Sequence, residues 1–436
     1  PIYSQMCGNS TLIQAVVPVD LNNDGKTDLL LDAWCDLTGL NLASFPVGST
    51  YNGPIKNTAI ALLQQNDGTF IIGNKQIFGY DTLAFEGSWS NPIIGDFNND
   101  GKPDIAVSNS MEDGRTPVTY SNGTSNMDAH VQVLLSSPTT YQLYSIGTAG
   151  ASINLSVVKD SQNRDMLLFG DVAWVYNNGW NSITYNTPTV SLTQFISNNI
   201  NFMAGEILDN STLGISLYQQ INNLWSQIDA YTFANTQYVT VYDPKYGANY
   251  NTQQLLTTIN GVDWLIPSIE DGCMIRKGAT NTFAVMFQGL KMNTRYVGQQ
   301  LNFSDSNLGT YISMVLLVDI MNGRITNVSA TNMQAIGYFS IQCIDMNNDS
   351  STDIVINRWL DGGTLQPDVY MNKSTTFSQT QVLTSNTNNY KGTTTVVTDL
   401  YKTNNPVVIY YPLLGLNPNY TGDVRLMLYK NNNNWN

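Results

Sequence analysis

The sequence is poor in charge and in histidine. Only 12% of its 436 residues are charged, and 19 Lys and Arg against 33 Asp and Glu give a formal net charge of −14. So acidic a chain lacks the basic surface that neutralises phosphates, which argues against nucleic acid and anionic membranes as partners. His130 is the single histidine, which excludes histidine-cluster metal sites and leaves little room for a histidine general base.

Cysteines and long apolar runs are also scarce. The four cysteines, at positions 7, 35, 273 and 343, show no CxxC spacing, which disfavours zinc and thioredoxin-type chemistry. They either form disulfides or stay free. If two disulfides form, we expect Cys7 to pair with Cys35, because both would fall in or beside the same repeat. No apolar stretch approaches the roughly 18 residues of a membrane span, so we expect no direct membrane insertion.

What the sequence does contain is a repeated acidic segment. Asp20-Leu-Asn-Asn-Asp-Gly-Lys-Thr-Asp28 returns in similar form at residues 96–104 and 345–353. We call these the first, second and third acidic loops. Apolar runs flank each copy, so each unit predicts a strand, a polar loop and a second strand.

A second pattern joins an apolar pair to an aromatic residue through a short polar turn. Its seven copies are Leu62-Leu63 to Phe70, Leu134-Leu135 to Tyr141, Val175-Tyr176 to Trp180, Leu217-Tyr218 to Trp225, Met286-Phe287 to Tyr296, Val369-Tyr370 to Phe377 and Leu428-Tyr429 to Trp435. Their starts span 428 − 62 = 366 positions over six intervals, a mean of 61. We interpret the pair as the third strand of a blade and the aromatic as the start of the fourth.

These two patterns predict an all-β fold. Degenerate copies of the acidic segment lie at residues 157–165, 206–214, 260–263 and 399–407. Open sheets in a row leave unpaired edges unless they close into a ring. The sequence therefore predicts one domain over residues 1–436, a seven-bladed β-propeller of four-stranded antiparallel blades, with the acidic loops between strands one and two of three blades.

Two segments depart from the repeat. Trp435 stands at the chain end with no room for a fourth strand, so we expect residues 1–7 to pair with the last blade as its outer strand; the alternative is a frayed N-terminus. Residues 302–334, with a hairpin-like segment at 319–324, are predicted as an insertion after the fifth blade, or as an eighth, degenerate blade.

The acidic loops have the chemistry of a calcium site. Ca²⁺ takes about six to eight oxygen ligands from carboxylates, amides, carbonyls and water, and each loop offers side-chain oxygens at positions 1, 3, 5 and 9 with a backbone carbonyl at position 7. The predicted ligands of three Ca²⁺ ions are Asp20, Asn22, Asp24, Lys26 and Asp28; Asp96, Asn98, Asp100, Lys102 and Asp104; and Asp345, Asn347, Asp349, Ser351 and Asp353.

Several features of the loops refine this prediction. Gly25 and Gly101 permit a positive φ, whereas Ser350 takes that place in the third loop and predicts strain or weaker binding there. Apolar residues at position 12 exclude an EF-hand. The alternative is a polar turn without an ion, but three matched copies argue against it. Mg²⁺ is disfavoured because the ligand set is rich in protein oxygens.

Residues 95–107 and 62–70 together resemble the two halves of an FG-GAP or VCBS repeat, as found in integrin α-subunit heads and in bacterial surface and secreted proteins. The resemblance implies a seven-bladed propeller with calcium loops on its lower face. It also implies recognition of a partner by loops on the upper face, and an extracellular or cell-surface location.

Polar and aromatic residues occur where the second strands should end, away from the acidic loops. The candidate ligand-binding residues are Trp34, Asp36, Trp174, Arg358, Trp359 and Asp361. Aromatic faces beside hydrogen-bonding groups can stack on sugars or anchor a protein partner; equally, such tryptophans can pack between blades. The sequence thus predicts a calcium-stabilised extracellular recognition or adhesion module that binds a protein or a carbohydrate.

Two other classes of function remain. A structural scaffold, such as a surface filament or a toxin-complex component, is the alternative, and the uncharged surface suits self-assembly. A propeller hydrolase or lyase is the weaker alternative. No GxSxG, Asp-box, HExxH or Walker motif is present, and fold alone does not give function, so we expect no enzymatic activity.

Overall fold

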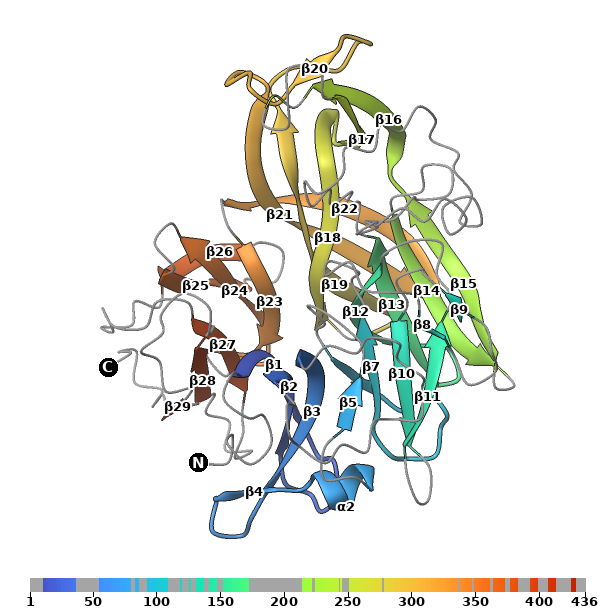
Figure 1. Cartoon of the computed structure of the whole chain (residues 1–436), viewed down its shortest axis with the longest axis vertical. Coiled ribbons are helices and arrows are strands. Elements are labelled where there is room, and N and C mark those ends of the chain that lie inside the picture. Colours follow the sequence, from blue (N-terminus) through green and yellow to red (C-terminus); the bar gives the residue numbers. More distant parts are fainter. Residues whose placement is uncertain are drawn as a thin grey trace.

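The computed structural model is built from β-strands, with one short helix, α2 (Asn74–Phe78), among the described residues (Figure 1). It describes residues 11–36, 55–79, 83–85, 92–108, 118–119, 125–126, 131–136, 141–146, 152–171, 214–221, 224–242, 244, 251–276, 278–335, 338–346, 349–360, 364–372, 377–382, 393–398, 407–412 and 425–428. Within these ranges, no helix has the length and apolar character needed to cross a bilayer.

Four sheets have the predicted antiparallel order of strand, loop, strand and hairpin. The first contains β1 (Thr11–Val19), β2 (Asp28–Asp36), β3 (Ile55–Gln64) and β4 (Phe70–Ile72), with β5 (Leu83–Phe85) also pairing with β3. The second contains β6 (Ile93–Gly95), β7 (Asp104–Ser108), β10 (Val131–Ser136) and β11 (Tyr141–Ile146). The third contains β12 (Ser152–Lys159), β13 (Asp165–Asp171), β14 (Gly214–Ile221) and β15 (Leu224–Thr232). The last of these four is the fifth sheet in chain order, and it contains β23 (Tyr338–Ile344), β24 (Asp353–Leu360), β25 (Thr364–Asn372) and β26 (Phe377–Val382).

These sheets confirm the predicted strand positions. The acidic loops connect the first and second strands of the first, second and fifth sheets, and the degenerate copy at residues 157–165 contains the corresponding turn of the third. Phe70, Tyr141 and Phe377 each open the fourth strand of their sheet. The apolar pair followed by an aromatic therefore marks a real hairpin in these blades.

The fourth sheet is larger than the repeat predicts. Its order is β20 (Leu301–Asn302), β16 (Ala234–Tyr242), β17 (Asn251–Ile259), β18 (Val262–Arg276), β19 (Thr280–Met292), β21 (Gly309–Met321) and β22 (Arg324–Ala335). Residues 302–334, predicted as an insertion, mostly extend this same sheet, since β21 pairs with β19 from end to end. The β16, β17 and β20 end of the sheet stands away from the other sheets at the top of Figure 1.

One strand prediction in this sheet is wrong and one is confirmed. Tyr296 does not open a fourth strand, because β19 continues past Met286-Phe287 to Met292 and Tyr296 lies in the connection that follows. The hairpin at residues 319–324 is confirmed: Asn322 and Gly323 have φ values of 51° and 71°, the left-handed pair that a two-residue hairpin turn requires.

The sixth sheet has three strands in the described residues: β27 (Thr393–Thr398), β28 (Val407–Pro412) and β29 (Arg425–Leu428). Residues 1–7, predicted to add a strand here, lie outside the described residues, as does Val175-Tyr176, which contributed to the count of seven blades. A separate ribbon pairs β8 (Val118–Thr119) with β9 (Ser125–Asn126). The structure supports mostly four-stranded antiparallel sheets, and the count of seven stays a prediction.

Apolar clusters join each of the first four sheets to the next. Buried side chains of β2 and β7, of β7 and β13, of β13 and β19, and of β19 and β24 lie in four successive clusters. The sixth sheet contacts the fifth through β27 and the first through β1. The sheets therefore follow one another in a closed circuit, which is consistent with a β-propeller-like fold.

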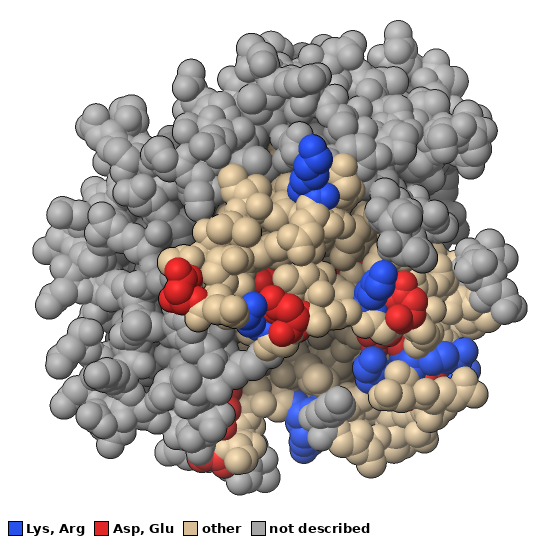
Figure 2. All heavy atoms as spheres, turned by 90° about the horizontal axis from the view of Figure 1, so that it is seen from below, with Lys and Arg blue, Asp and Glu red and all other residues tan. Residues whose placement is uncertain are grey.

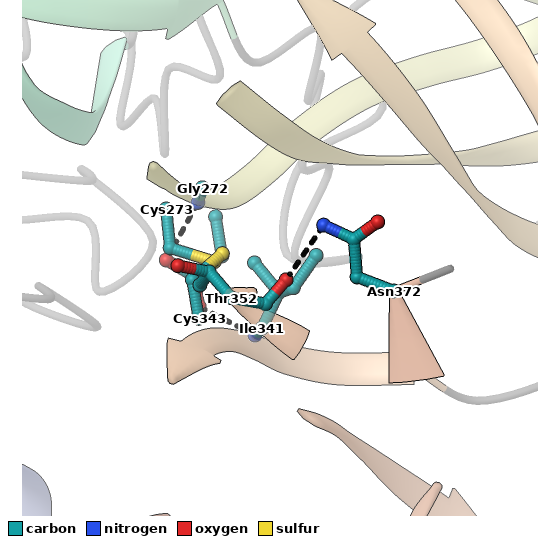
Figure 3. Close-up of a disulfide and its surroundings, with 7 residues drawn as sticks. Gly272, Cys273, Ile341, Cys343, Thr352 and Asn372 are labelled. Atoms are coloured by element: carbon teal, nitrogen blue, oxygen red, sulfur yellow. Dashed lines mark hydrogen bonds between the residues drawn. A yellow bond between two sulfur atoms is a disulfide. The ribbon is translucent and has the colours of Figure 1, made fainter. Parts of the chain in front are cut away.

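A disulfide also connects two neighbouring sheets. Cys273 on β18 bonds to Cys343 on β23, with their Cα atoms 5.6 Å apart (Figure 3). Beside it, Oδ2 of Asp271 accepts the backbone N–H of Ile341 at 2.8 Å. If Cys7 pairs with Cys35, the two remaining cysteines are Cys273 and Cys343, which is the pair that is bonded here. Cys7 lies outside the described residues, so the Cys7–Cys35 pairing stays a prediction.

We predict that the Cys273–Cys343 disulfide makes a large contribution to stability. Its loop spans 70 residues, and restricting such a loop in the unfolded chain contributes about 4 kcal/mol. The double variant Cys273→Ala/Cys343→Ala should lose about that much in urea unfolding under oxidising conditions. A variant as stable as the parent protein would show that the disulfide does not constrain the unfolded chain.

Candidate metal centres in the acidic loops

The three acidic loops share one hydrogen-bond pattern. The N–H of the fifth residue donates to Oδ1 of the first: Asp24 to Asp20 at 3.0 Å, Asp100 to Asp96 at 2.9 Å and Asp349 to Asp345 at 3.1 Å. The N–H of the sixth residue donates to Oδ2 of the same carboxylate, from Gly25 at 2.8 Å, Gly101 at 3.0 Å and Ser350 at 2.7 Å. These bonds wrap the loop around its first carboxylate, as in an extended Asx turn.

The last carboxylate of each loop is buried and bonded at both oxygens. Asp28, Asp104 and Asp353 are each 0% exposed. Oδ2 of each accepts the N–H of the second loop residue, from Leu21 at 3.0 Å, Phe97 at 2.7 Å and Met346 at 2.9 Å. Oδ1 accepts an N–H from the end of the third strand, from Gln64 at 2.8 Å, Ser136 at 2.7 Å and Asn372 at 2.8 Å. Each carboxylate thus attaches its loop to the third strand of the sheet.

The partners on the third strand were not predicted from the sequence. Gln64 and Ser136 come directly after their apolar pairs, and Asn372 follows one residue later. A polar residue at the end of the third strand was therefore the available signal. Ser136 does more than donate its N–H, because its hydroxyl also lies 3.1 Å from both carboxylate oxygens of Asp100.

Burial changes the acidity of these carboxyl groups. Desolvation raises the pKa of Asp104 to about 6, although N–H bonds from Ser136 and Phe97 oppose the shift. Desolvation likewise raises the pKa of Asp28 and of Asp353. By contrast, a hydrogen bond from the Lys26 ammonium lowers the pKa of the exposed Asp24. A cation at the second loop would therefore compete with a proton at Asp104 in mildly acidic solution.

The backbone of the loops confirms the expected need for left-handed residues. Gly25 and Gly101 have φ values of 85° and 81°, and Ser350 keeps a φ of 68° at the same place in the third loop. A side chain in this region costs about 1–2 kcal/mol. The third loop therefore retains the shape of the other two at the expense of strain at Ser350.

The donors present suit a hard divalent cation. In the first loop, Oδ1 of Asp20 and Oδ1 of Asn22 both accept the N–H of Asp24. The Lys26 ammonium lies 2.7 Å from Oδ2 of Asp24, where it supplies the positive charge that a metal ion would bring. Asp28 can still contact a metal, because each carboxylate oxygen has a second lone pair.

Two observations limit how many of the predicted metal ligands the structure brings together at these loops. Within the described ranges, no group of three or more His, Cys, Asp and Glu side chains is arranged to hold a metal ion; such a group leaves out the amide and carbonyl oxygens that calcium also uses. Asn347, a predicted ligand of the third loop, lies outside the described residues. Asn23 Nδ2 donates to the carbonyl of Gly101 at 3.3 Å, so the first and second loops touch.

The corresponding turn of the third sheet supplies its own cation. Oδ2 of Asp160 accepts Nε of Arg164 at 2.9 Å, forms an ion pair with Nη2 at 2.8 Å and accepts Nε2 of Gln219 at 2.8 Å. Burial opposes ionisation, yet the bonds from Gln219 and Arg164 lower the pKa of Asp160. The Arg164 guanidinium thus neutralises this carboxylate, with two of its nitrogens at one carboxylate oxygen. Figure 2 shows several acidic and basic side chains side by side on the described surface in that view, while others of each kind stand alone.

Four of the candidate ligand-binding residues lie on strands at a distance from the acidic loops. β2 and β24 run from the last residue of an acidic loop to Asp36 and Leu360. Trp34 and Asp36, and Arg358 and Trp359, therefore occupy the strand ends farthest from the loops. Their side chains, like Trp174 and Asp361 as whole residues, lie outside what the structure describes.

The family model for the FG-GAP repeat matches residues 88–125, which include the second acidic loop. No curated protein sequence matches the chain. A protein of unknown function from Dyadobacter fermentans DSM 18053 has a similar structure, with a TM-score of 0.47, 9% identity and coverage of 97% of this chain and 94% of its own. An endo-arabinase from Bacteroides thetaiotaomicron VPI-5482 scores 0.37 at 10% identity, covering 84% of this chain and 96% of its own. An α-L-arabinofuranosidase from Clostridium thermocellum ATCC 27405 scores 0.33 at 12% identity, covering 77% and 88%.

We predict that Ser350→Gly stabilises the protein by about 1 kcal/mol, because the left-handed strain that it relieves exceeds the added entropy of an unfolded glycine. Ser351→Gly is the matched control. Ser351 is not among the residues with positive φ, so glycine there should destabilise by about 0.5–1 kcal/mol. Urea unfolding in EDTA measures both, and equal effects of the two substitutions would contradict the strain at Ser350.

Proposed function

We propose that this protein is a calcium-stabilised extracellular recognition module. The observation that supports calcium best is the repetition of one hydrogen-bonded acidic loop in three sheets, with matched oxygen donors at each. The FG-GAP repeat match over residues 88–125 agrees with this assignment. Three bound Ca²⁺ would change the formal charge from −14 to −8, relieving repulsion among the crowded carboxylates.

The role proposed for calcium is structural. At the first loop, Asp20, Asn22, Asp24, Asp28 and the carbonyl of Lys26 would hold the ion, with the equivalent residues at the second and third loops. A hard cation supplies the positive charge that these carboxylates lack, as Arg164 does within the third sheet. The loop side of the protein would then serve stability and leave the opposite strand ends for binding.

The extracellular location and the partner are part of the same proposal. A disulfide between the fourth and fifth sheets suits an oxidising compartment. The acidic, charge-poor composition suits a protein or glycan ligand better than a polyanion. Trp34, Asp36, Arg358 and Trp359, with Trp174 and Asp361, are the residues that we assign to ligand contact at the ends of strands distant from the loops. We propose binding without catalysis.

Calcium should raise the melting temperature by mass action. At pH 7.5, above the pKa of Asp104, each site adds about 2.7 kcal/mol at a calcium concentration of 100 Kd. Asp24→Ala, Asp100→Ala and Asp349→Ala should each remove about one third of the rise between EDTA and millimolar calcium. Asp67→Ala, which removes an exposed carboxylate from the turn between β3 and β4, should leave that rise intact. Identical melting curves with EDTA and with calcium would refute the calcium sites.

Binding should depend on the tryptophans far from the loops. On glycan and protein arrays, Trp34→Ala and Trp359→Ala should each weaken the signal about tenfold or more, as expected for aromatic anchors. Asp24→Ala is the control: below its melting temperature it should bind like the parent protein. Ordered polymers without any array ligand would favour a scaffold, and turnover on sugar or ester panels would instead reveal a hydrolase or lyase.

A further inference from the structure

The second acidic loop lies at the junction between the second and third sheets. Phe97, the second residue of the loop, is 1% exposed, and its ring packs edge-to-face on Trp225 of β15 with ring centroids 5.6 Å apart. The same apolar cluster contains Leu167 and Phe169 of β13. The position of this loop therefore depends on contacts with a neighbouring sheet as well as its own.

A buried carboxylate of the third sheet contacts the backbone of this loop. Asp165, the first residue of β13, is 4% exposed, and its Oδ2 accepts the N–H of Asp96 at 2.6 Å. Its Oδ1 forms an ion pair with the Lys159 ammonium. A Cβ atom on Gly95 would come within 3.2 Å of Asp165 Oδ2 and 2.7 Å of the Phe97 ring, so the glycine leaves room for the contact.

The place of Asp165 in the repeat explains why this carboxylate is available. It opens the second strand of its sheet, as Asp28, Asp104 and Asp353 do in theirs. The turn before it is short, and its other carboxylate, Asp160, is neutralised by Arg164. Asp165 instead accepts an N–H from a residue 69 positions earlier in the chain.

We propose that Asp165 is a positioning residue for calcium at the second acidic loop. This positioning role rests on the proposed calcium function, and it adds to that function a residue that lies outside all three loops. Asp96 is the first predicted ligand of the second loop, and the hydrogen bond to its own N–H fixes the backbone from which its carboxylate projects. Groups that orient metal ligands from outside contribute about 10–100-fold to metal affinity. Calcium at this loop and the contact between the second and third sheets therefore strengthen each other.

The experiment isolates the second loop. The double variant Asp24→Ala/Asp349→Ala removes a central ligand from the first and third loops, and calcium is titrated into it by calorimetry. Adding Asp165→Leu should weaken the remaining site about tenfold or more. Adding Asp165→Asn, which keeps an acceptor oxygen for the N–H of Asp96, should hold the affinity within about threefold, a rescue that a loss of negative charge alone would not give.

Asp160→Leu is the matched control. It removes the same charge from the turn just before Asp165, but Asp160 bonds to Arg164 and Gln219 and not to the second loop. Affinity should therefore stay within about threefold, because the orienting bond from Asp165 to Asp96 is intact. Equal losses from Asp160→Leu and Asp165→Leu, or no loss from Asp165→Leu, would overturn the role of Asp165. A double variant that binds no calcium would refute the second metal site itself.

A further variant keeps the test decisive if Asp165→Leu does not fold. Lys159→Met removes the ammonium that pairs with Asp165 and should weaken calcium binding about threefold or more, less than loss of the orienting carboxylate itself. Unchanged affinity in Lys159→Met, or a loss in Asp165→Asn as large as the roughly tenfold expected of Asp165→Leu, would overturn the proposal.

Discussion

The interaction on which each acidic loop depends is a buried carboxylate that accepts two backbone N–H groups. Asp28, Asp104 and Asp353 have no exposed surface, and a buried charge persists only when it is paired or hydrogen bonded. One N–H belongs to the loop and the other to the third strand. Loop, second strand and third strand therefore depend on one another, since an unmet buried group costs about 1–3 kcal/mol.

Carboxylates also connect neighbouring sheets. Asp165 accepts an N–H from the second sheet, Asp271 from the fifth, and Asp229 accepts the N–H of Ile325 between the third and fourth at 2.8 Å. Apolar contacts between sheets are not directional, whereas each of these bonds requires a particular alignment. The chain has few charged residues, and several of the carboxylates that the structure describes therefore serve to align neighbouring sheets.

The predictable parts of the structure were those with local signals. Spacing of acidic and apolar residues located the loops, their flanking strands and the start of several fourth strands. The left-handed backbone at the sixth residue of each loop followed from the position of Gly25 and Gly101. Tyr296 was misplaced because nothing local marks where β19 ends. The N–H donors Gln64, Ser136 and Asn372 were missed because their role depends on register between strands, which a slip of one residue would abolish.

The sequence by itself determined the all-β class, the chemistry of the acidic loops and the order of strands around them, because alternation of apolar residues and turn chemistry act within a few positions. Tertiary structure alone decided that residues 302–334 mostly extend the fourth sheet, that Cys273 bonds to Cys343, and that Asp165 contacts Asp96. These outcomes join groups distant in sequence, and packing between sheets selects them after the strands have formed.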